Sequence, residues 1–95
     1  MRVGLAKIEM IFPYAQSLKE KRFHLRKIKD KTFAKFKVSV SEVDYHDKWQ
    51  RSLLGLSVCG NDAVVLSSLM DKVINFIEDT SEGEMVDSLS EVISF

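Results

Sequence analysis

Apolar and polar positions alternate along residues 2–12, with the period of two that predicts a β-strand. Near its start this segment is apolar on both faces, which is typical of a strand in the middle of a sheet. Proline has no amide proton to donate to a sheet, so we expect the strand to end at Pro13. One face of the predicted strand carries Gly4, Ala6, Ile8, Met10 and Phe12.

The next segment has helical spacing and predicts a helix that begins at Ser17 and ends near residues 34–35. Ser17 and Glu20 have the spacing of a capping box, in which the serine oxygen accepts from the Glu20 amide while the glutamate reaches back. Lysines and arginines cover much of the surface outside the apolar stripe, so we expect them on an exposed face of a folded helix. The stripe consists of Leu18, Leu25, Ile28 and Thr32.

The remaining pattern predicts a second helix and further strands. Residues 36–43 alternate again and are rich in valine, which favours a strand. Asn61 or Asp62 is expected to cap a helix that extends to about residue 79. Strands are also predicted at residues 51–59 and 85–94, with a polar connection at 44–50.

The predicted order of elements is β-α-β-β-α-β, the split βαβ or ferredoxin-like arrangement. We therefore predict an α+β fold with a four-stranded antiparallel sheet and both helices on one face. The other face is expected to be open to solvent or to a partner. With 95 residues, the chain is long enough for one modest core, so residues 1–95 are predicted to form a single domain.

Composition narrows the class of protein. Hydrophobic residues make up 45% of the chain and charged residues 29%, which is typical of a folded domain. No apolar run approaches the roughly 20 residues of a membrane helix, and the start lacks the layout of a signal peptide. The single cysteine, Cys59, excludes an internal disulfide and fits a reducing compartment. We therefore expect a cytoplasmic protein with no membrane partner.

The net charge is zero, but the charges are segregated along the chain. Residues 19–37 carry nine Lys and Arg against two acids, whereas residues 61–95 carry eight acids against one lysine. Some lysines of the first helix could pair with Asp71, Glu78 and Asp79 on the second, at roughly 0–1 kcal/mol each. Nine basic residues around a helix cannot all face one neighbour, so part of the positive field is expected to point outward.

The densest polar cluster contains Glu42, Asp44, His46 and Asp47. Three carboxylates and a histidine this close together raise a metal-site hypothesis. We favour the simpler interpretation, in which Asp44 and Asp47 are turn and capping residues whose side chains bond their own backbone two residues on. Asp47 could also pair with Lys48 or Arg51.

Three single residues have alternative interpretations. Trp49 either plugs the end of the core, which we favour, or anchors a partner. His24 is expected on the surface of the basic helix rather than as a catalytic base. Cys59 is expected to be a small buried strand residue whose thiol is not activated.

No catalytic signature accompanies these residues. The four glycines are scattered at positions 4, 55, 60 and 83, so no glycine-rich loop follows the first strand to bind a phosphate group. Nucleophile-elbow, phosphate-loop and zinc-protease patterns are also missing. We therefore predict that the protein is not an enzyme and uses no cofactor.

Several segments together resemble the YlxP-like family of short bacterial proteins. The resemblance spans nearly the whole chain and is carried by the segments at 17–22 (SLKEKR), 38–44 (VSVSEVD), 49–51 (WQR) and 54–55 (LG), with Asp47, Asn61 and Asp62. It implies a ferredoxin-like fold and a domain of unassigned biochemical function. Such genes commonly lie beside those for translation initiation and ribosome maturation factors, which suggests a ribosome-linked role.

These observations give one leading hypothesis for function, a module that binds structured RNA or the ribosome through its basic first helix. Backbone-dominated and salt-sensitive binding is expected, with phosphates contacted by the helix and a base stacked on Trp49 or Tyr45. The nucleic-acid-binding residues are predicted to be Lys19, Lys21, Arg22, Arg26, Lys27, Lys29, Trp49 and Arg51.

The alternative is a protein-interaction or homodimerisation domain. An open sheet face with apolar side chains needs cover, and residues 36–43 are expected to form an edge strand that can pair with a second copy. The apolar side chains expected on that face are Val3, Leu5 and Ile11, with Val38 and Val40 or their neighbours. A metal-dependent enzyme built on Glu42, Asp44, His46 and Asp47 is the third hypothesis.

Overall fold

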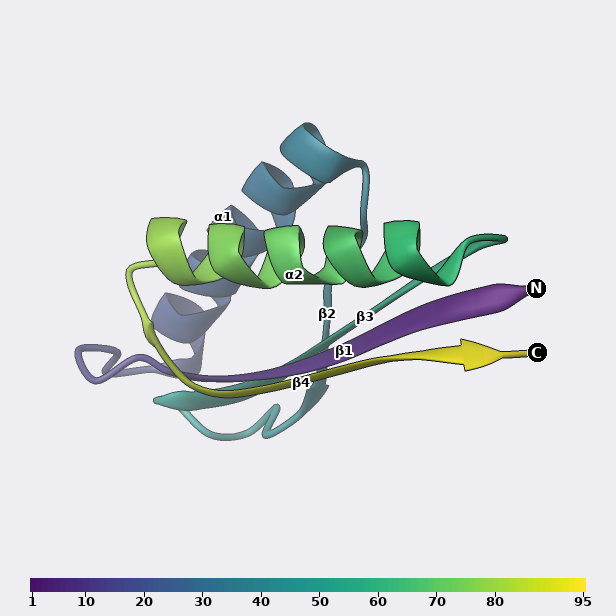
Figure 1. Ribbon diagram of the computed structural model, residues 1–95. Coiled ribbons are helices and arrows are strands. Elements are labelled where there is room, and N and C mark those ends of the chain that lie inside the picture. The colour runs from purple at the N-terminus through teal and green to yellow at the C-terminus, as the bar shows by residue number, and fades with distance from the viewer.

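The sheet and two helices of this protein are described by a computed structural model that covers residues 1–95. Its strands form a four-stranded antiparallel sheet in the order β2-β3-β1-β4, and both helices lie on one face of it (Figure 1). The predicted ferredoxin-like α+β fold is therefore confirmed. The elements are β1 (Arg2–Ile11), α1 (Leu18–Phe36), β2 (Ser41–Asp44), β3 (Arg51–Gly60), α2 (Ala63–Thr80) and β4 (Glu84–Ser94).

The core lies between the sheet and the helices. β1 and β3 pair along their full length, from Arg2 opposite Gly60 to Ile11 opposite Arg51, so their side chains alternate between the same two faces. The face toward the helices is buried and apolar, and it packs against stripes on α1 and α2 at helical spacing. Its centre is made by Ile8, Met10, Leu54, Met70, Val73 and Ile77.

Side chains cap both helices at their first residues. The Ser17 hydroxyl accepts from the Glu20 amide at 3.1 Å, as the capping box predicted, while the Glu20 carboxylate accepts from the Gln16 amide at 2.9 Å. At α2, the Asp62 carboxylate accepts from the backbone amides of Val64 and Val65. Asp62, and not Asn61, is therefore the N-cap of this helix. Neither helix is apolar enough over its length to span a membrane.

The strand predicted at residues 36–43 is wrong in its first half. α1 continues through Phe36, whose ring packs edge-to-face on Phe76 with centroids 5.4 Å apart, and β2 covers only Ser41–Asp44. Val38 and Val40 are each only 5% exposed, so they belong to the core and not to the open sheet face. Apolar and polar residues do alternate at positions 37–40, because buried and exposed side chains alternate along an extended segment. That segment pairs with no strand.

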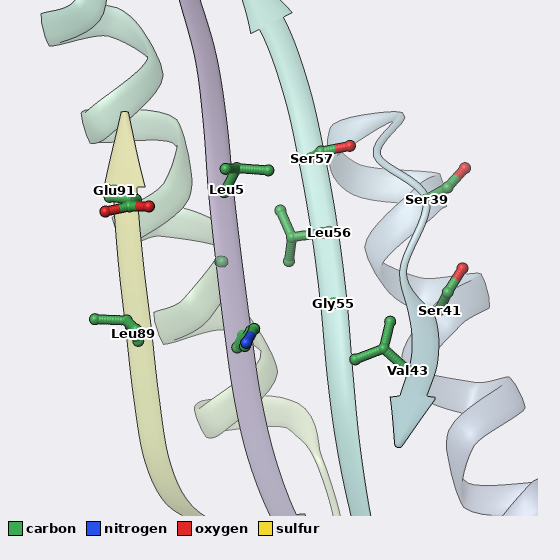
Figure 2. Close-up of a pocket in the computed structure, with 11 residues that line it drawn as sticks. Leu5, Ser39, Ser41, Val43, Gly55, Leu56, Ser57, Leu89 and Glu91 are labelled. Carbon is green, nitrogen blue, oxygen red and sulfur yellow. The ribbon is translucent and has the colours of Figure 1, made fainter. Parts of the chain in front are cut away.

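The open face of the sheet carries the other side chains of β1 and β3. Val3, Leu5 and Ile11 lie here as expected, and β4 adds Leu89 and Ile93 because they stand opposite Lys7 and Val3. Figure 2 looks onto part of this face, with the helices behind the sheet. The surface is hollowed there by a cavity of about 610 Å³ beside Leu5, Val43 and Leu89.

A glycine and a cysteine on β3 are also placed by this register. A Cβ on Gly55 would lie 2.9 Å from Val43 Cγ1, so the glycine lets the short β2 strand fold closely against β3. Cys59 stands opposite Val3 and is exposed. The expectation of a buried Cys59 is therefore wrong, because its strand position points to the face that no helix covers.

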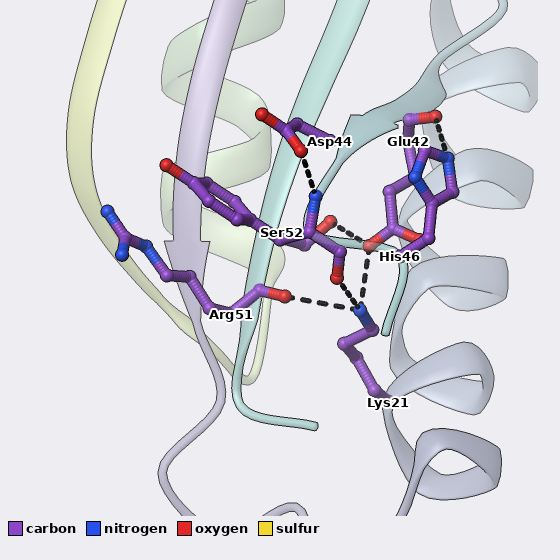
Figure 3. Close-up of polar contacts among 7 residues, drawn as sticks. Lys21, Glu42, Asp44, His46, Arg51 and Ser52 are labelled. Carbon is purple, nitrogen blue, oxygen red and sulfur yellow. Dashed lines mark hydrogen bonds and ion pairs between the residues drawn. The ribbon is translucent and has the colours of Figure 1, made fainter. Parts of the chain in front are cut away.

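A buried lysine joins α1 to the edge strand β2 and to the start of β3. The Lys21 side chain is fully buried, and its ammonium nitrogen lies 2.9 Å from Glu42 Oε2 (Figure 3). It also donates to the carbonyl oxygens of Tyr45 at 2.8 Å and Arg51 at 3.2 Å. Ser52 donates to the same Glu42 oxygen at 2.6 Å. All three ammonium protons therefore have acceptors, and the two ends of the loop between β2 and β3 are held by one side chain.

Replacing Lys21 tests how much this network stabilises the fold. We expect Lys21→Met to lower the free energy of unfolding by about 3–5 kcal/mol, because it leaves the Glu42 carboxylate desolvated and unpaired. Urea denaturation provides the measurement. Lys19→Met, at an exposed position on the same helix, should change stability by no more than about 0.5 kcal/mol. Equal effects from the two variants would contradict a structural role for the Lys21 ion pair.

Candidate nucleic-acid interface

One flank of α1 carries cations and an aromatic ring at helical spacing. Arg22, Arg26, Lys29, Phe33 and Lys37 are three or four residues apart, so they follow one another along a single side of the helix. We call these five residues the basic flank. The stripe that faces the sheet is a different one, made of Lys21, Leu25, Ile28 and Thr32, all of which are buried.

The basic flank borders a groove. One hollow of about 500 Å³ lies between Arg22, Arg26 and the β2 segment, where Ser41 and His46 form the opposite side. A second hollow of about 520 Å³ lies farther along the helix, beside Phe33 and Lys37. Lys29 lines both hollows, so they follow one another along α1. We call them together the α1–β2 groove.

Few of the basic side chains on α1 are neutralised. Lys27 pairs with Glu82 at 2.6 Å, and it is the one cation of residues 19–37 that pairs with the acidic second half of the chain. The predicted pairing with Asp71, Glu78 and Asp79 is wrong, because none of these carboxylates forms an ion pair within 4.0 Å. The cations without an acidic partner are Lys19, Arg22, Arg26, Lys29, Lys31, Lys35 and Lys37.

Glu82 joins α1 to the loop before β4. Its carboxylate accepts from Lys27, and the other oxygen lies 3.1 Å from His24 Nδ1. The hydrogen bond from Lys27 holds the pKa of Glu82 below its ordinary value of 4.5. His24 is not a free surface residue as expected, since its ring stacks on Phe12 with centroids 5.6 Å apart and 17% of its side chain is exposed.

Two of the residues predicted to bind nucleic acid lie apart from the groove. Arg51 is on the open sheet face, where its guanidinium pairs with Glu9 at 2.7 Å and covers the Tyr45 ring at 4.3 Å. The hydrogen bond to Glu9 raises the pKa of Arg51 above its ordinary value. Trp49 is 55% exposed in the loop before β3, so the interpretation as a core plug is wrong and its interpretation as a partner contact stays open.

The basic residues of α1 that were predicted to bind nucleic acid lie on different sides of the helix. Arg22, Arg26 and Lys29 meet on the basic flank. Lys19 is exposed in the first turn, and Lys27 is paired with Glu82 on another side. The prediction that Lys21 contacts phosphate is wrong, because its side chain is fully buried. Its spacing of four residues from Leu25 was the signal that it lies on the inward stripe.

The polar cluster considered as a metal site has other contacts. Glu42 binds Lys21 and Ser52 (Figure 3). The Asp44 carboxylate accepts from the amide of the next residue, Tyr45, at 2.7 Å, and so bonds local backbone one residue on instead of two. His46 Nε2 lies 3.0 Å from the Glu42 carbonyl oxygen. Asp47 forms no ion pair with Lys48 or Arg51. Within the structure, no three His, Cys, Asp or Glu side chains are grouped as metal ligands.

The groove also includes residues that the sequence analysis missed. Phe33 and Lys37 were not assigned to a binding surface, and His46 was considered only as a metal ligand. The spacing of Phe33 and Lys37 from Lys29 could have identified them, but Lys37 was placed in the strand predicted at residues 36–43. His46 reaches the groove through the loop after β2, and no local pattern in the sequence indicates that.

Comparison with known proteins identifies a family and a relative that match most of this chain. Residues 3–89 match a family model described as "Protein of unknown function (DUF503)". The chain is also 38% identical over 82 residues to "Uncharacterized protein YlxP" of Bacillus subtilis (strain 168). That alignment covers 86% of this chain and 89% of the relative.

The contact between Glu82 and Lys27 predicts a dependence of stability on pH. Because the pKa of Glu82 is lowered in the folded protein, its contribution is fully present above about pH 4.5 and is lost as the pH falls through the folded value. We expect Glu82→Gln to lower the urea midpoint slightly at pH 7 and to match the original protein at about pH 2. The control Glu78→Gln removes a carboxylate without an ion pair, and a similar pH-dependent difference there would contradict this assignment.

Proposed function

This chain belongs to the DUF503 family, whose function is unknown, and we propose that it is a cytoplasmic binding module that takes the backbone of a structured RNA in the α1–β2 groove. A role on the ribosome is one form of this proposal. The protein would act by binding rather than by catalysis. One observation carries the proposal, namely that Arg22, Arg26, Lys29 and Lys37 border one groove and have no acidic partner.

The dimensions of the basic flank suit a run of phosphates. An α-helix rises about 1.5 Å per residue, so the flank from Arg22 to Lys37 is roughly 22 Å long. Arginine supplies planar, always charged donors that match phosphate oxygens, and Arg22 and Arg26 stand one turn apart. Ser41 and His46 can add hydrogen bonds from the opposite wall. These groups contact backbone, so the binding they support is salt-dependent and weakly sequence-specific.

The distribution of charge supports a single docking orientation. The overall charge is zero, so the protein has no general attraction for polyanions. Eight of its acids lie in residues 61–95, which form α2 and β4. An RNA is therefore repelled by that side and attracted by the basic flank.

Removing three cations of the groove tests the proposal. We expect the variant R22Q/R26Q/K29Q to bind an RNA hairpin at least tenfold more weakly than the original protein at low salt. The slope of log affinity against log salt should fall by about 2 to 3, because each phosphate contact contributes about 0.7 in a single strand and about 0.9 in a DNA duplex. Fluorescence anisotropy over a salt titration gives both quantities.

The chain provides a control with the same change in net charge. R2Q/K7Q/K72Q removes three exposed cations outside the groove. This variant should keep most of the affinity and the salt slope. Equal losses in the two triple variants would reject the groove, and absence of binding to the original protein even at low salt would reject the function.

A second candidate function is homodimerisation through the open sheet face, and the exposed apolar side chains there favour it. Leu89 is 65% exposed and Val43 is 50% exposed on a face that no helix covers (Figure 2). Ile93, opposite Val3 on the same face, is 39% exposed. The same face carries Lys7 and Glu91, and a two-fold related copy can bring these opposite charges together.

Sedimentation at micromolar concentration tests the dimer. We expect the original protein to sediment as a dimer and Leu89→Asp to sediment as a monomer, because a charge would be buried at the interface. Val64→Asp is the matched control, since Val64 is 79% exposed on α2 and away from the sheet face. A monomer for the original protein would contradict this candidate.

A further inference from the structure

Within the α1–β2 groove, we propose that the hollow at the end of α1 is a site for one unpaired nucleobase of RNA. The base would stack on the Phe33 ring, and Lys37 and Lys29 would hold its neighbouring phosphates. This inference rests on the proposed function and specifies its substrate class as RNA with unpaired nucleotides, as opposed to continuous duplex.

Phe33 is an exposed aromatic residue near the C-terminal end of α1. Its side chain is 51% exposed and it lines a hollow of about 520 Å³. It makes no aromatic pair and is outside the hydrophobic core. Phe36, three residues later, packs on Phe76 against the core instead. The Lys37 ammonium lies over the Phe33 ring, and the exposed remainder of the ring lines the hollow.

Lys37 has a backbone conformation that a lysine adopts at a steric cost. It caps the end of α1 in the left-handed region, with φ 58° and ψ 33°, and its amide donates to the Phe33 carbonyl at 2.9 Å. Glycine is the usual residue in this role because it has no Cβ to clash. A strained residue that the local structure could replace with glycine points to a use for its side chain. That side chain places its ammonium 5.6 Å from the centre of the Phe33 ring.

The chemistry of the hollow fits a base with its phosphates. Every nucleobase has a π-face that stacks on an aromatic ring, and this is possible once the base is unpaired. Lys29 and Lys37 lie on either side of Phe33 along the helix and can neutralise the flanking phosphates. Asp30 also lines the hollow, and its carboxylate repels phosphate but can accept from an exocyclic amino group of the base. The hollow thus offers an aromatic ring and an acceptor to a base, and two cations to its phosphates.

Two RNA probes and two substitutions test this inference on the full chain. The probes are a hairpin with an unpaired loop and a blunt duplex of the same phosphate count. We expect Phe33→Leu to weaken binding of the looped hairpin by roughly tenfold or more and to leave duplex binding unchanged. Leucine keeps an apolar side chain but removes the stacking surface. If the hollow takes an aliphatic side chain of a protein partner and not a base, F33L should bind the looped hairpin as tightly as the original protein does.

Lys37→Gly supplies a readout that a purely structural role would not give. We expect this variant to melt at a higher temperature than the original protein, because the left-handed cap is relieved, and to bind both RNA probes several-fold more weakly. A lower melting temperature with unchanged RNA affinity would assign Lys37 to stability alone and overturn the inference.

The outcomes separate this inference from the function on which it rests. If R22Q/R26Q/K29Q weakens RNA binding while F33L leaves the looped hairpin unaffected, the groove binds backbone and the base site is rejected. If F33L weakens both probes equally, the ring supports the helix and does not stack a base. If the original protein binds neither probe at low salt, the RNA-binding function itself is rejected.

Discussion

The buried ammonium of Lys21 is the contact on which the arrangement of this protein depends. A charge removed from water must have its full set of acceptors, and here they come from Glu42 and from two carbonyl oxygens at either end of the β2–β3 loop. This requirement fixes the rotation of α1 about its own axis. Because Lys21 faces inward, the next residue and those at helical spacing from it face the groove. The opposite wall of the groove starts from Glu42, so the same ion pair positions both sides.

The order of elements, the two helix starts and the family could be predicted from the sequence, because each depends on local patterns. The capping box of Ser17 and Glu20 predicts where the first helix begins. The alternation of apolar and polar residues in β1 predicts a strand in a sheet that is covered on one face. The errors came where one pattern has two physical causes. Val38 and Val40 alternate because they are buried in an extended segment, not because that segment pairs in the sheet. Trp49 and Cys59 are apolar but exposed, and whether tertiary structure covers such a residue is not encoded locally.

The candidate site was predictable in part for the same reason. Arg22, Arg26 and Lys29 could be found because clustered charge on a helix is visible in the sequence. The inward position of Lys21 could have been recognised from its spacing of four residues from Leu25, but its pairing with Glu42 could not. The separation of Arg51 could not be predicted either, since it depends on an ion pair with Glu9, which is distant in the chain. The acidic second half was expected to neutralise the first helix, yet Glu82 alone reaches it. A neutral protein can therefore present a concentrated positive surface, provided that its opposite charges lie on different elements.

The pairing of β1 with β4 also has a consequence for how this fold forms. Arg2 stands opposite Ser94, so the central strand β1 acquires its second neighbour from residues at the other end of the sequence. Until β4 is added, one side of β1 has free amides and carbonyls, and a half-made sheet of this kind is open to wrong partners. Closing such a long loop is slow compared with forming the helices. Before β4 docks, the folding chain therefore exposes an unpaired edge of β1 that favours aggregation.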